Sequence, residues 1–214
     1  MRRILVVDDH PLLRHGIVQL IGLEGDMEVV GEAGSVEQAL RALAGGPVDL
    51  ALVDLTLEGL SGIELLKTIR LRHPATRTLV VSMHDELLYA ERALRAGARG
   101  YLMKHEAPKR IVAAIREALA GSIVLSEAMR SRLLERFAKS PDAAPGTPLQ
   151  ALSDREFEVF TLIGKGLKKS EIAQRIQRSV NTVEAHRASI KRKLNLKSAA
   201  ELARAAFQAL QDQK

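Results

Sequence analysis

Leu50-Ala-Leu-Val-Asp54 is a short apolar run that ends in a carboxylate. The same pattern recurs at Ile4-Leu-Val-Val-Asp-Asp9, Thr78-Leu-Val-Val-Ser82 and Gly100-Tyr-Leu-Met-Lys104, where polar side chains also follow apolar runs. Runs of this kind are typical of strands buried on both faces of a parallel sheet. Ligands of open α/β sheets bind beyond the carboxyl ends of the strands. We therefore expect one site that contains Asp8, Asp9, Asp54, Ser82 and Lys104.

Segments with helical spacing separate the apolar runs. Strands are expected at residues 4–7, 28–30, 50–53, 78–81 and 100–103, and Ile63, Leu66 and Ile69 show helical spacing between two of them. The patterns Ser35-x-x-Gln38 and Ser61-x-x-Glu64 predict helix starts with capping boxes. The expected fold is α/β: a flavodoxin-like (βα)₅ unit with a doubly wound parallel sheet. One more helix is expected at residues 126–138.

The charge distribution divides the chain into two parts. Residues 1–150 hold 19 Lys and Arg and 19 Asp and Glu, whereas residues 151–214 hold 13 and 7 and so carry the whole net charge of +6. A basic segment favours a polyanionic partner, although a solvated helix surface is an equally common source of such charge. Three Pro within residues 139–150 indicate a semi-stiff linker. We expect domains at residues 1–121 and 151–214, joined by residues 122–150.

The composition also limits the cellular compartments in which the chain is expected. The chain has no Cys, which excludes disulfides and thiolate metal sites and is compatible with a reducing compartment. The apolar run near Met1 is shorter than the roughly 7 to 15 residues of a signal peptide. No run approaches the roughly 18 apolar residues of a membrane span. We expect a cytoplasmic protein with no membrane partner.

The expected site combines carboxylates with an ammonium group. Clustered carboxylates repel one another, and an oxygen-rich cluster suits Mg²⁺. Lys104 then favours an anion, and a phosphoryl group suits both partners because phosphoryl transfer needs mainly positioning and electrostatic stabilisation. Each residue taken alone also has a structural interpretation: Asp8 or Asp9 as an N-cap before Pro11, and Ser82 as a strand-end hydroxyl. The histidines are expected to be ordinary residues, and for His84, just beyond Ser82, a surface role is favoured over a place at the border of the phosphoryl pocket.

The C-terminal segment predicts four short helices. Ser153-Asp-Arg-Glu156 is a capping box that opens the first, residues 170–176 and 181–194 form the next two, and Ser198-Ala-Ala-Glu201 opens an Ala-rich fourth. A short helix, a tight turn and a longer basic helix are typical of a helix-turn-helix, whose second helix lies in the DNA major groove. The expected DNA contacts are Thr182, Glu184, Ala185, Arg187, Ala188, Lys191, Arg192 and Lys193.

About residues 1–121 strongly resemble the receiver domain of bacterial response regulators, through the polar residues at the four strand ends. The resemblance implies that Asp54 is phosphorylated and that Lys104 and Ser82 bind the phosphoryl oxygens. It also implies Mg²⁺ at Asp8, Asp9, Asp54 and the backbone carbonyl of Thr56, with Tyr101 as the switch side chain. Two residues depart from the commonest pattern. Glu58 and His105 stand where many receivers have Pro, in the second case after a cis peptide bond.

Residues 151–206 closely resemble the LuxR-type helix-turn-helix, in the segments Leu152-Ser-Asp-Arg-Glu-Phe-Glu-Val159, Lys169-Ser-Glu-Ile-Ala173 and Thr182-Val-Glu-Ala-His-Arg187. A receiver, a linker and this module together resemble NarL/FixJ-type response regulators. The resemblance implies a two-component transcription regulator that is phosphorylated by a sensor histidine kinase, forms a homodimer when phosphorylated and binds double-stranded DNA. Many relatives carry Lys at the position of Glu184, so the base contacts of the family do not transfer directly.

Two other functions remain open on the sequence. A constitutive DNA-binding regulator would use its receiver-like domain only for dimerisation or for binding a partner, and its DNA binding would not depend on Asp54. A phosphatase of the haloacid-dehalogenase type would use a phospho-aspartyl intermediate. That class expects two acids spaced two residues apart after the first strand, whereas Asp8 and Asp9 are adjacent. The sequence therefore favours a regulator over an enzyme.

Overall fold

The computed structural model describes residues 1–57, 61–139 and 148–211. The chain divides into two compact units, Met1–Arg136 and Phe137–Lys214. Glu58 and most of the Pro-rich stretch, residues 140–147, lie outside the described residues. Within the described ranges, no helix has both the length and the apolar character needed to cross a membrane.

The N-terminal unit contains a five-stranded parallel sheet. Its strands are β1 (Arg2–Val7), β2 (Met27–Ala33), β3 (Leu50–Val53), β4 (Arg77–Ser82) and β5 (Tyr101–Met103), in the order β2-β1-β3-β4-β5. All four strand pairings are parallel. The order reverses direction at β1 and β3, which confirms the predicted flavodoxin-like, doubly wound sheet.

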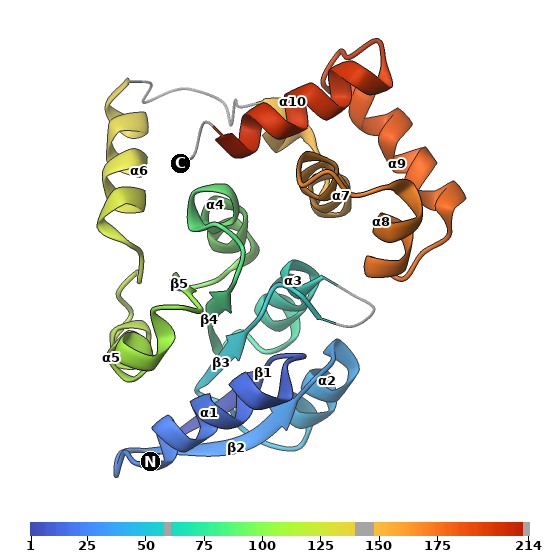
Figure 1. Ribbon diagram of the computed structural model, residues 1–214. Helices are drawn as coiled ribbons and strands as arrows, with labels where there is room; N and C mark the ends of the chain where they lie inside the picture. The colour runs from blue at the N-terminus through green and yellow to red at the C-terminus, as the bar shows by residue number, and fades with distance from the viewer. Residues whose placement is uncertain (58–60, 140–147, 212–214) are drawn as a thin grey trace. The chain divides into compact units, whose positions relative to one another are not determined.

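Helices cover both faces of this sheet (Figure 1). Helices α1 (Pro11–Gly22) and α5 (Ala107–Leu119) pack into one core with Ile4, Leu52 and Leu79. Helices α2 (Val36–Ala44), α3 (Gly62–Arg72) and α4 (Glu86–Ala96) lie on the other face. Burial on both faces is the reason that the strands are continuous apolar runs rather than alternating ones. Helix α6 (Glu127–Lys139) confirms the helix expected at residues 126–138.

Three predicted capping boxes are incomplete. At Ser198, the side chain of Glu201 accepts from the amide of Lys197 rather than from that of Ser198. Ser35 and Ser61 are the N-caps of α2 and α3, as expected. However, the side chain of Gln38 accepts from the backbone of Gly34 rather than from that of Ser35. The hydroxyl of Ser61 accepts from Ile63, one residue earlier than a capping box requires. The helix starts were therefore predicted correctly, but the reciprocal hydrogen bonds were not.

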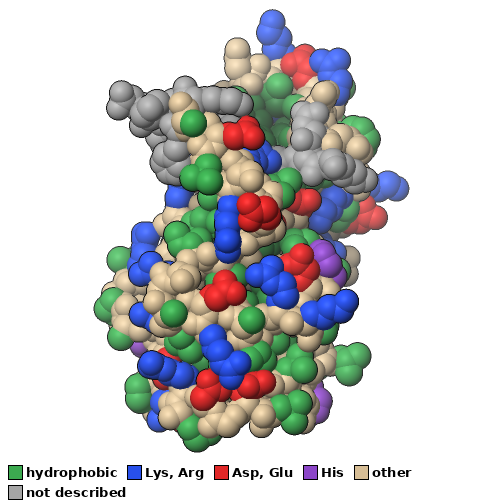
Figure 2. Space-filling model, turned by 90° about the vertical axis from the view of Figure 1, so that its left-hand side faces the viewer, with side chains coloured by type: hydrophobic (Ala, Val, Ile, Leu, Met, Phe, Trp, Pro, Cys, Tyr) green, Lys and Arg blue, Asp and Glu red, His purple; other side chains and the backbone are tan. Residues whose placement is uncertain are grey.

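Several surface charges of the N-terminal unit are paired with charges of opposite sign. Arg14 lies 3.2 Å from Glu32, and Arg116 joins α5 to the segment before β2 through Glu24 and Asp26, at 2.7 and 2.8 Å. Figure 2 shows positive and negative side chains interspersed over the face that it draws. Such exposed pairs contribute about 0 to 1 kcal/mol each.

The C-terminal unit is helical. After a 3₁₀ turn (Pro148–Ala151) come α7 (Asp154–Gly164), α8 (Lys169–Arg175), α9 (Val180–Lys193) and α10 (Ala199–Gln211). The predicted capping box of Ser153 and Glu156 is confirmed, with both hydrogen bonds present. At Gly164 a Cβ would collide with the backbone oxygen of Ala206, so this glycine allows α7 and α10 to pack closely. Short α8, a turn and longer α9 form the expected helix-turn-helix.

Candidate functional site

Four of the strand-end residues form a buried polar group. Asp8 follows β1, Asp54 follows β3, Ser82 ends β4 and Lys104 follows β5, and each is at most 4% exposed. The ammonium nitrogen of Lys104 lies 2.7 Å from Asp54 Oδ2 and 2.7 Å from Asp8 Oδ2. The structure thus brings together side chains that are up to 96 residues apart in the sequence.

Backbone hydrogen bonds fix the positions of these strand ends. The amide of Asp54 donates to the carbonyl of Val7, and the amide of Lys104 donates to that of Ser82, both at 2.9 Å. Gly62, the first residue of α3, lies so close to Asp54 that a Cβ would collide with its backbone oxygen. The alternative of Asp8 or Asp9 as an N-cap is wrong, because His10 occupies the N-cap of α1.

The acidic cluster carries more negative charge than Lys104 can offset. One ligand atom from each of Asp8, Asp9, Asp54 and His10 lies within 4.8 Å of the others. Asp54 Oδ1 is buried and has no hydrogen-bond partner among the described residues. Burial raises the pKa of Asp54, and the positive charge of Lys104 opposes this rise. Burial lowers the pKa of Lys104, but Asp54 and Asp8 outweigh it, so its net pKa is raised.

This set of donors fits a divalent cation. Three carboxylates facing one ammonium group leave an excess negative charge, and Asp54 Oδ1 is a buried oxygen that needs a partner. Hard cations such as Mg²⁺ take oxygen ligands of this kind. Asp9 is half-buried at the cluster, and Thr56 follows Asp54 by two residues and is also half-buried. His10 was not expected here, yet its Nδ1 lies 2.6 Å from Asp9 Oδ1.

A second network connects Ser82 with Tyr101 through His84. The amide of His84 donates to Ser82 Oγ at 3.2 Å, and its carbonyl accepts from the hydroxyl of Tyr101 at 2.8 Å. Its Nε2 lies 3.0 Å from Thr56 Oγ1, and its ring is 4.5 Å from that of Tyr89. The expectation of an ordinary surface role for His84 is therefore wrong. Tyr101 is 1% exposed, and burial raises its pKa well above the usual value.

Helix α4 is tied to the start of α6 within the N-terminal unit. The carboxylate of Glu86, in the first turn of α4, accepts a hydrogen bond of 2.9 Å from the amide of Ser126. Glu86 is 7% exposed and Ser126 is half-buried, so this contact is partly shielded from water. Sequence reasoning missed it because nothing in the pattern relates a first-turn Glu to a loop 40 residues later. The contact links the first turn of α4 to the helix that leads into the linker.

The face of α9 expected to contact DNA is open to solvent. Ala185, Ala188 and Arg192 are exposed, whereas Val183 and Ile190 are fully buried against the rest of the unit. Thr182, Arg187 and Lys191 are half-buried on its flanks. Helix α9 therefore has an apolar face turned inward and an open face that carries residues expected to contact DNA.

Glu184 is not a free negative charge on this face. It forms an ion pair with Lys169 of α8, and Arg187 lies 3.9 Å away. The hydrogen bond from Lys169 lowers the pKa of Glu184, so the carboxylate is ionised near neutral pH. Because two cations flank it, the repulsion of Glu184 on a nearby phosphate is offset.

Lys193 forms an ion pair with Glu156 within the C-terminal unit. Its ammonium nitrogen lies 2.6 Å from Glu156 Oε2, and the hydroxyl of Ser189 donates to the other oxygen of Glu156 at 2.6 Å. Burial raises the pKa of Glu156, but the hydrogen bonds from Lys193 and Ser189 outweigh it and lower this pKa to about 2. Glu156 therefore anchors α9 on α7.

Comparison with known families agrees with the fold of the two units. Residues 4–116 match the family described as response regulator receiver domain, and residues 150–206 match the luxR family of bacterial regulatory proteins. The chain belongs to the response regulators with a receiver domain and a LuxR-type helix-turn-helix. It is a two-component response regulator and a DNA-binding transcription factor, in a family of regulators rather than enzymes. Membership removes the phosphatase alternative.

Several individual relatives align over nearly the whole chain. The nitrate/nitrite response regulator protein NarL of Escherichia coli (strain K12) is 37% identical, over 94% of this chain and 92% of that protein. The oxygen regulatory protein NreC of Staphylococcus carnosus is 34% identical, over 94% of each chain. A solved structure of RcsB from Salmonella enterica serovar Typhimurium, bound to promoter rprA with phosphomimetic BeF₃⁻, has a TM-score of 0.64 and 25% identity. It covers 95% of this chain and 96% of its own.

Proposed function

We propose that a cognate sensor histidine kinase switches this regulator by phosphorylating Asp54. The phosphorylated form then dimerises and binds double-stranded DNA. The observation that carries the proposal is the state of the Asp54 carboxylate. One of its oxygens is held by Lys104, and the other is buried without a hydrogen-bond partner among the described residues. A structural carboxylate would have both oxygens satisfied.

The roles proposed for the site follow from charge and position. An oxygen of Asp54 attacks the phosphorus of the phosphohistidine. The new P–O bond forms as the P–N bond breaks, and the imidazole leaves with the electron pair and takes up a proton. Lys104 and Ser82 bind the phosphoryl oxygens. Asp8, Asp9, Asp54 and the Thr56 carbonyl would hold Mg²⁺, which supplies positive charge that offsets the repulsion between carboxylate and phosphate.

The switch is proposed to involve Ser82 and Tyr101. Ser82 Oγ now accepts from the amide of His84, and a phosphoryl group on Asp54 would compete for this hydroxyl. Tyr101 already occupies the buried position, with its hydroxyl on the His84 carbonyl. Phosphorylation would therefore increase the fraction of molecules in which the Tyr101 side chain occupies this buried position. The Glu86 contact with Ser126 offers a route from α4 to α6.

The output is proposed to be DNA binding by α9 in a two-fold dimer. RcsB has been solved bound to promoter DNA and as two dimers bound to two parallel DNAs, which supports the same assembly for this chain. Helix α10 would pair across the two-fold axis.

We place the receiver at residues 1–121, the linker at residues 122–150 and the DNA-binding domain at residues 151–214. A partner such as DNA also favours a cytoplasmic location.

The proposal is tested on the full chain with Mg²⁺ and BeF₃⁻. Sedimentation velocity and selection of binding sites from random DNA are compared for the wild type, Asp54→Asn and Asp26→Asn, the last being an exposed carboxylate on the surface of the unit. We expect BeF₃⁻ to promote dimers and site-specific binding in the wild type and in Asp26→Asn only. Equal dimerisation and DNA binding in all three proteins, with or without BeF₃⁻, would favour the constitutive regulator.

A further inference from the structure

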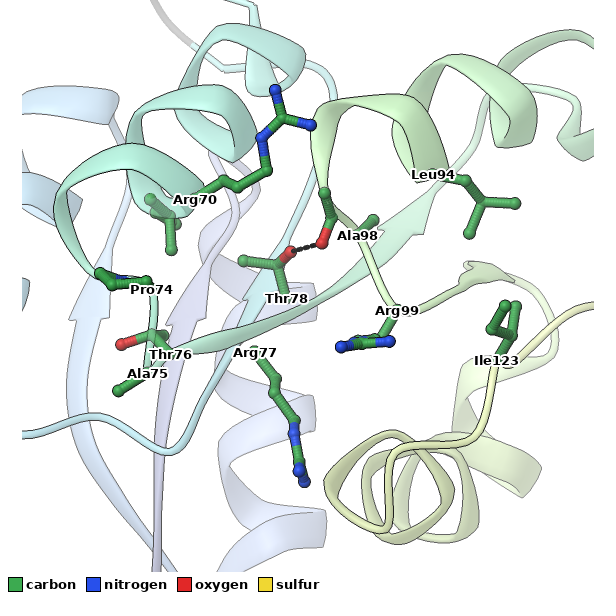
Figure 3. A pocket seen from close by; sticks show the side chains of 12 residues that line it. Arg70, Pro74, Ala75, Thr76, Arg77, Thr78, Leu94, Ala98, Arg99 and Ile123 are labelled. Carbon is green, nitrogen blue, oxygen red and sulfur yellow. Dashed lines mark hydrogen bonds between the residues drawn. The ribbon is translucent and has the colours of Figure 1, made fainter.

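A cavity of about 580 Å³ lies at the amino end of β4. It is bordered by the C-terminal turns of α3 and α4 and by the segment that follows α5. Three arginines line it, Arg70 from α3, Arg77 from β4 and Arg99 from the segment before β5. Leu94 and Ile123 form an apolar part of the cavity wall. Figure 3 shows Arg77 and Arg99 on one side of β4 and Arg70 on the other.

Two of these arginines lack the carboxylate partners that several other arginines of the unit have. Arg14 and Arg116 each pair with carboxylates. Among the residues that the structure describes, Arg77 and Arg99 have no ion pair and no side-chain hydrogen bond, although both line the same cavity. Positive charge gathered in a hollow and left without a partner favours an anionic ligand.

The third arginine is held in place by the chain. Arg70 donates a hydrogen bond of 2.6 Å to the carbonyl of Arg95 near the end of α4. Its aliphatic stem lies over Gly97, where a Cβ would come within 2.8 Å of Arg70 Cδ and where φ is +114°. Any other residue at position 97 would be strained in its backbone and would push Arg70 away. This wall of the cavity is therefore preformed.

The cavity is separate from the acidic cluster. Arg77 and Thr78 begin β4, whereas Ser82 ends it. At about 3.3 Å per residue, the first and last residues of this strand are roughly 16 Å apart. A ligand in the cavity would not occupy the phosphoryl site.

We propose that this cavity binds a phosphorylated small molecule of the nucleoside phosphate class. The planar guanidinium groups of Arg77 and Arg99 suit phosphate oxygens, which they can bind in a bidentate manner. Leu94 and Ile123 would contact the organic part of the ligand. The volume falls within the range of about 300 to 1,000 Å³ that is usual for small-molecule sites.

The test uses calorimetric titration of the full chain with ATP and with pyrophosphate. EDTA is present throughout, so that divalent ions do not bridge ATP to the acidic cluster. We expect ATP to bind, and Arg77→Ala/Arg99→Ala to weaken it at least tenfold. Arg72→Ala removes a nearby exposed charge that does not line the cavity, and it should leave the affinity within twofold. Pyrophosphate should bind more weakly than ATP, because it lacks the organic part.

A second measurement keeps the proposal falsifiable if the double variant does not fold. In amide NMR spectra of the wild type, ATP should shift the signals of Thr78, Gly97 and Arg99. The proposal is overturned if ATP does not bind, or if those signals stay unchanged. It is equally overturned if Arg187→Ala/Arg192→Ala, on the basic face of α9, abolishes the binding and the cavity variant does not.

Discussion

Lys104 Nζ donates a hydrogen bond of 2.7 Å to Asp54 Oδ2, although β4 lies between the strands that carry the two residues. The bond spans the carboxyl edge of the sheet, and both side chains are almost fully buried. Lys104 contacts Asp8 at the same distance. One ammonium group therefore holds two carboxylates in a site where their mutual repulsion is weakly screened.

Replacing Lys104 by Gln should both destabilise the N-terminal unit and slow its phosphorylation. Breaking a buried ion pair while its partner remains charged costs about 3 to 5 kcal/mol. Both tyrosines lie in the N-terminal unit and the chain has no Trp, so tyrosine emission during urea unfolding reports this unit alone. Lys109→Gln, at an exposed position of α5, is the control. Equal unfolding midpoints for the two variants would contradict the role of Lys104.

Tyr101→Phe should remove the hydrogen bond to the His84 carbonyl and keep the ring. A typical hydrogen bond contributes about 1 kcal/mol, so the buried position of this side chain should become several-fold less populated. We expect the DNA affinity of the BeF₃⁻-treated protein to fall by a similar factor, measured by fluorescence anisotropy. A variant that retains the affinity of the wild type would show that the hydroxyl has no part in the switch.

Glu156 should make the stability of the C-terminal unit depend on pH. Its pKa is about 2 in the folded state and 4.5 in its ordinary state, so its stabilising effect is complete above about pH 4.5. The effect is lost as the pH falls from 4.5 towards 2. Because Lys193 is partly exposed, we expect about 2 kcal/mol rather than the full value of the shift.

Amide hydrogen exchange in α7 and α9 measures this effect for Glu156→Gln. At pH 6 the variant should exchange faster than the wild type, and the difference should shrink as the pH approaches 3. Glu158→Gln, on the same helix and paired with Arg155 near the surface, serves as the control. A difference that does not change with pH would contradict the ionised pair.

Arg192→Ala and Lys193→Ala should affect different properties, although the residues are adjacent. Arg192 is exposed on the outer face of α9, so its loss should weaken DNA binding and reduce the slope of log affinity against log salt by about 1. Lys193 is bound to Glu156, so its loss should mainly destabilise the unit. Salt titrations of DNA affinity and hydrogen exchange separate the two. Equal effects on both properties would refute this division.

The fold could be predicted from the sequence because its information is local. Apolar runs such as Leu50–Val53 are long enough for a strand and too short for a helix. A polar residue, here Asp54, follows the run. The alternation of strands and helices then allows few topologies. On α9, Val183 and Ile190 lie about two helical turns apart and so share the buried face, which is also local information.

The remaining features depend on contacts between segments that carry no shared pattern. His84 follows Ser82 by two residues like any loop residue, and only the folded chain brings it to Thr56 and Tyr101. The pairing of Lys193 with Glu156 requires α7 and α9 to pack in one orientation. Spacing along one helix face cannot reveal a partner on another helix. From the sequence, Lys193 was therefore expected to contact DNA, and its ion pair with Glu156 was missed.

Intact mass measured after incubation with acetyl phosphate and Mg²⁺ tests the central claim most directly. One phosphoryl group adds about 80 Da through the chemistry of the modification. We expect this adduct in the wild type and in Asp26→Asn, its loss when Mg²⁺ is withheld, and its absence in Asp54→Asn. An adduct of the same yield in Asp54→Asn, or no adduct in a folded wild-type protein that binds DNA, would contradict Asp54 as the phosphoacceptor.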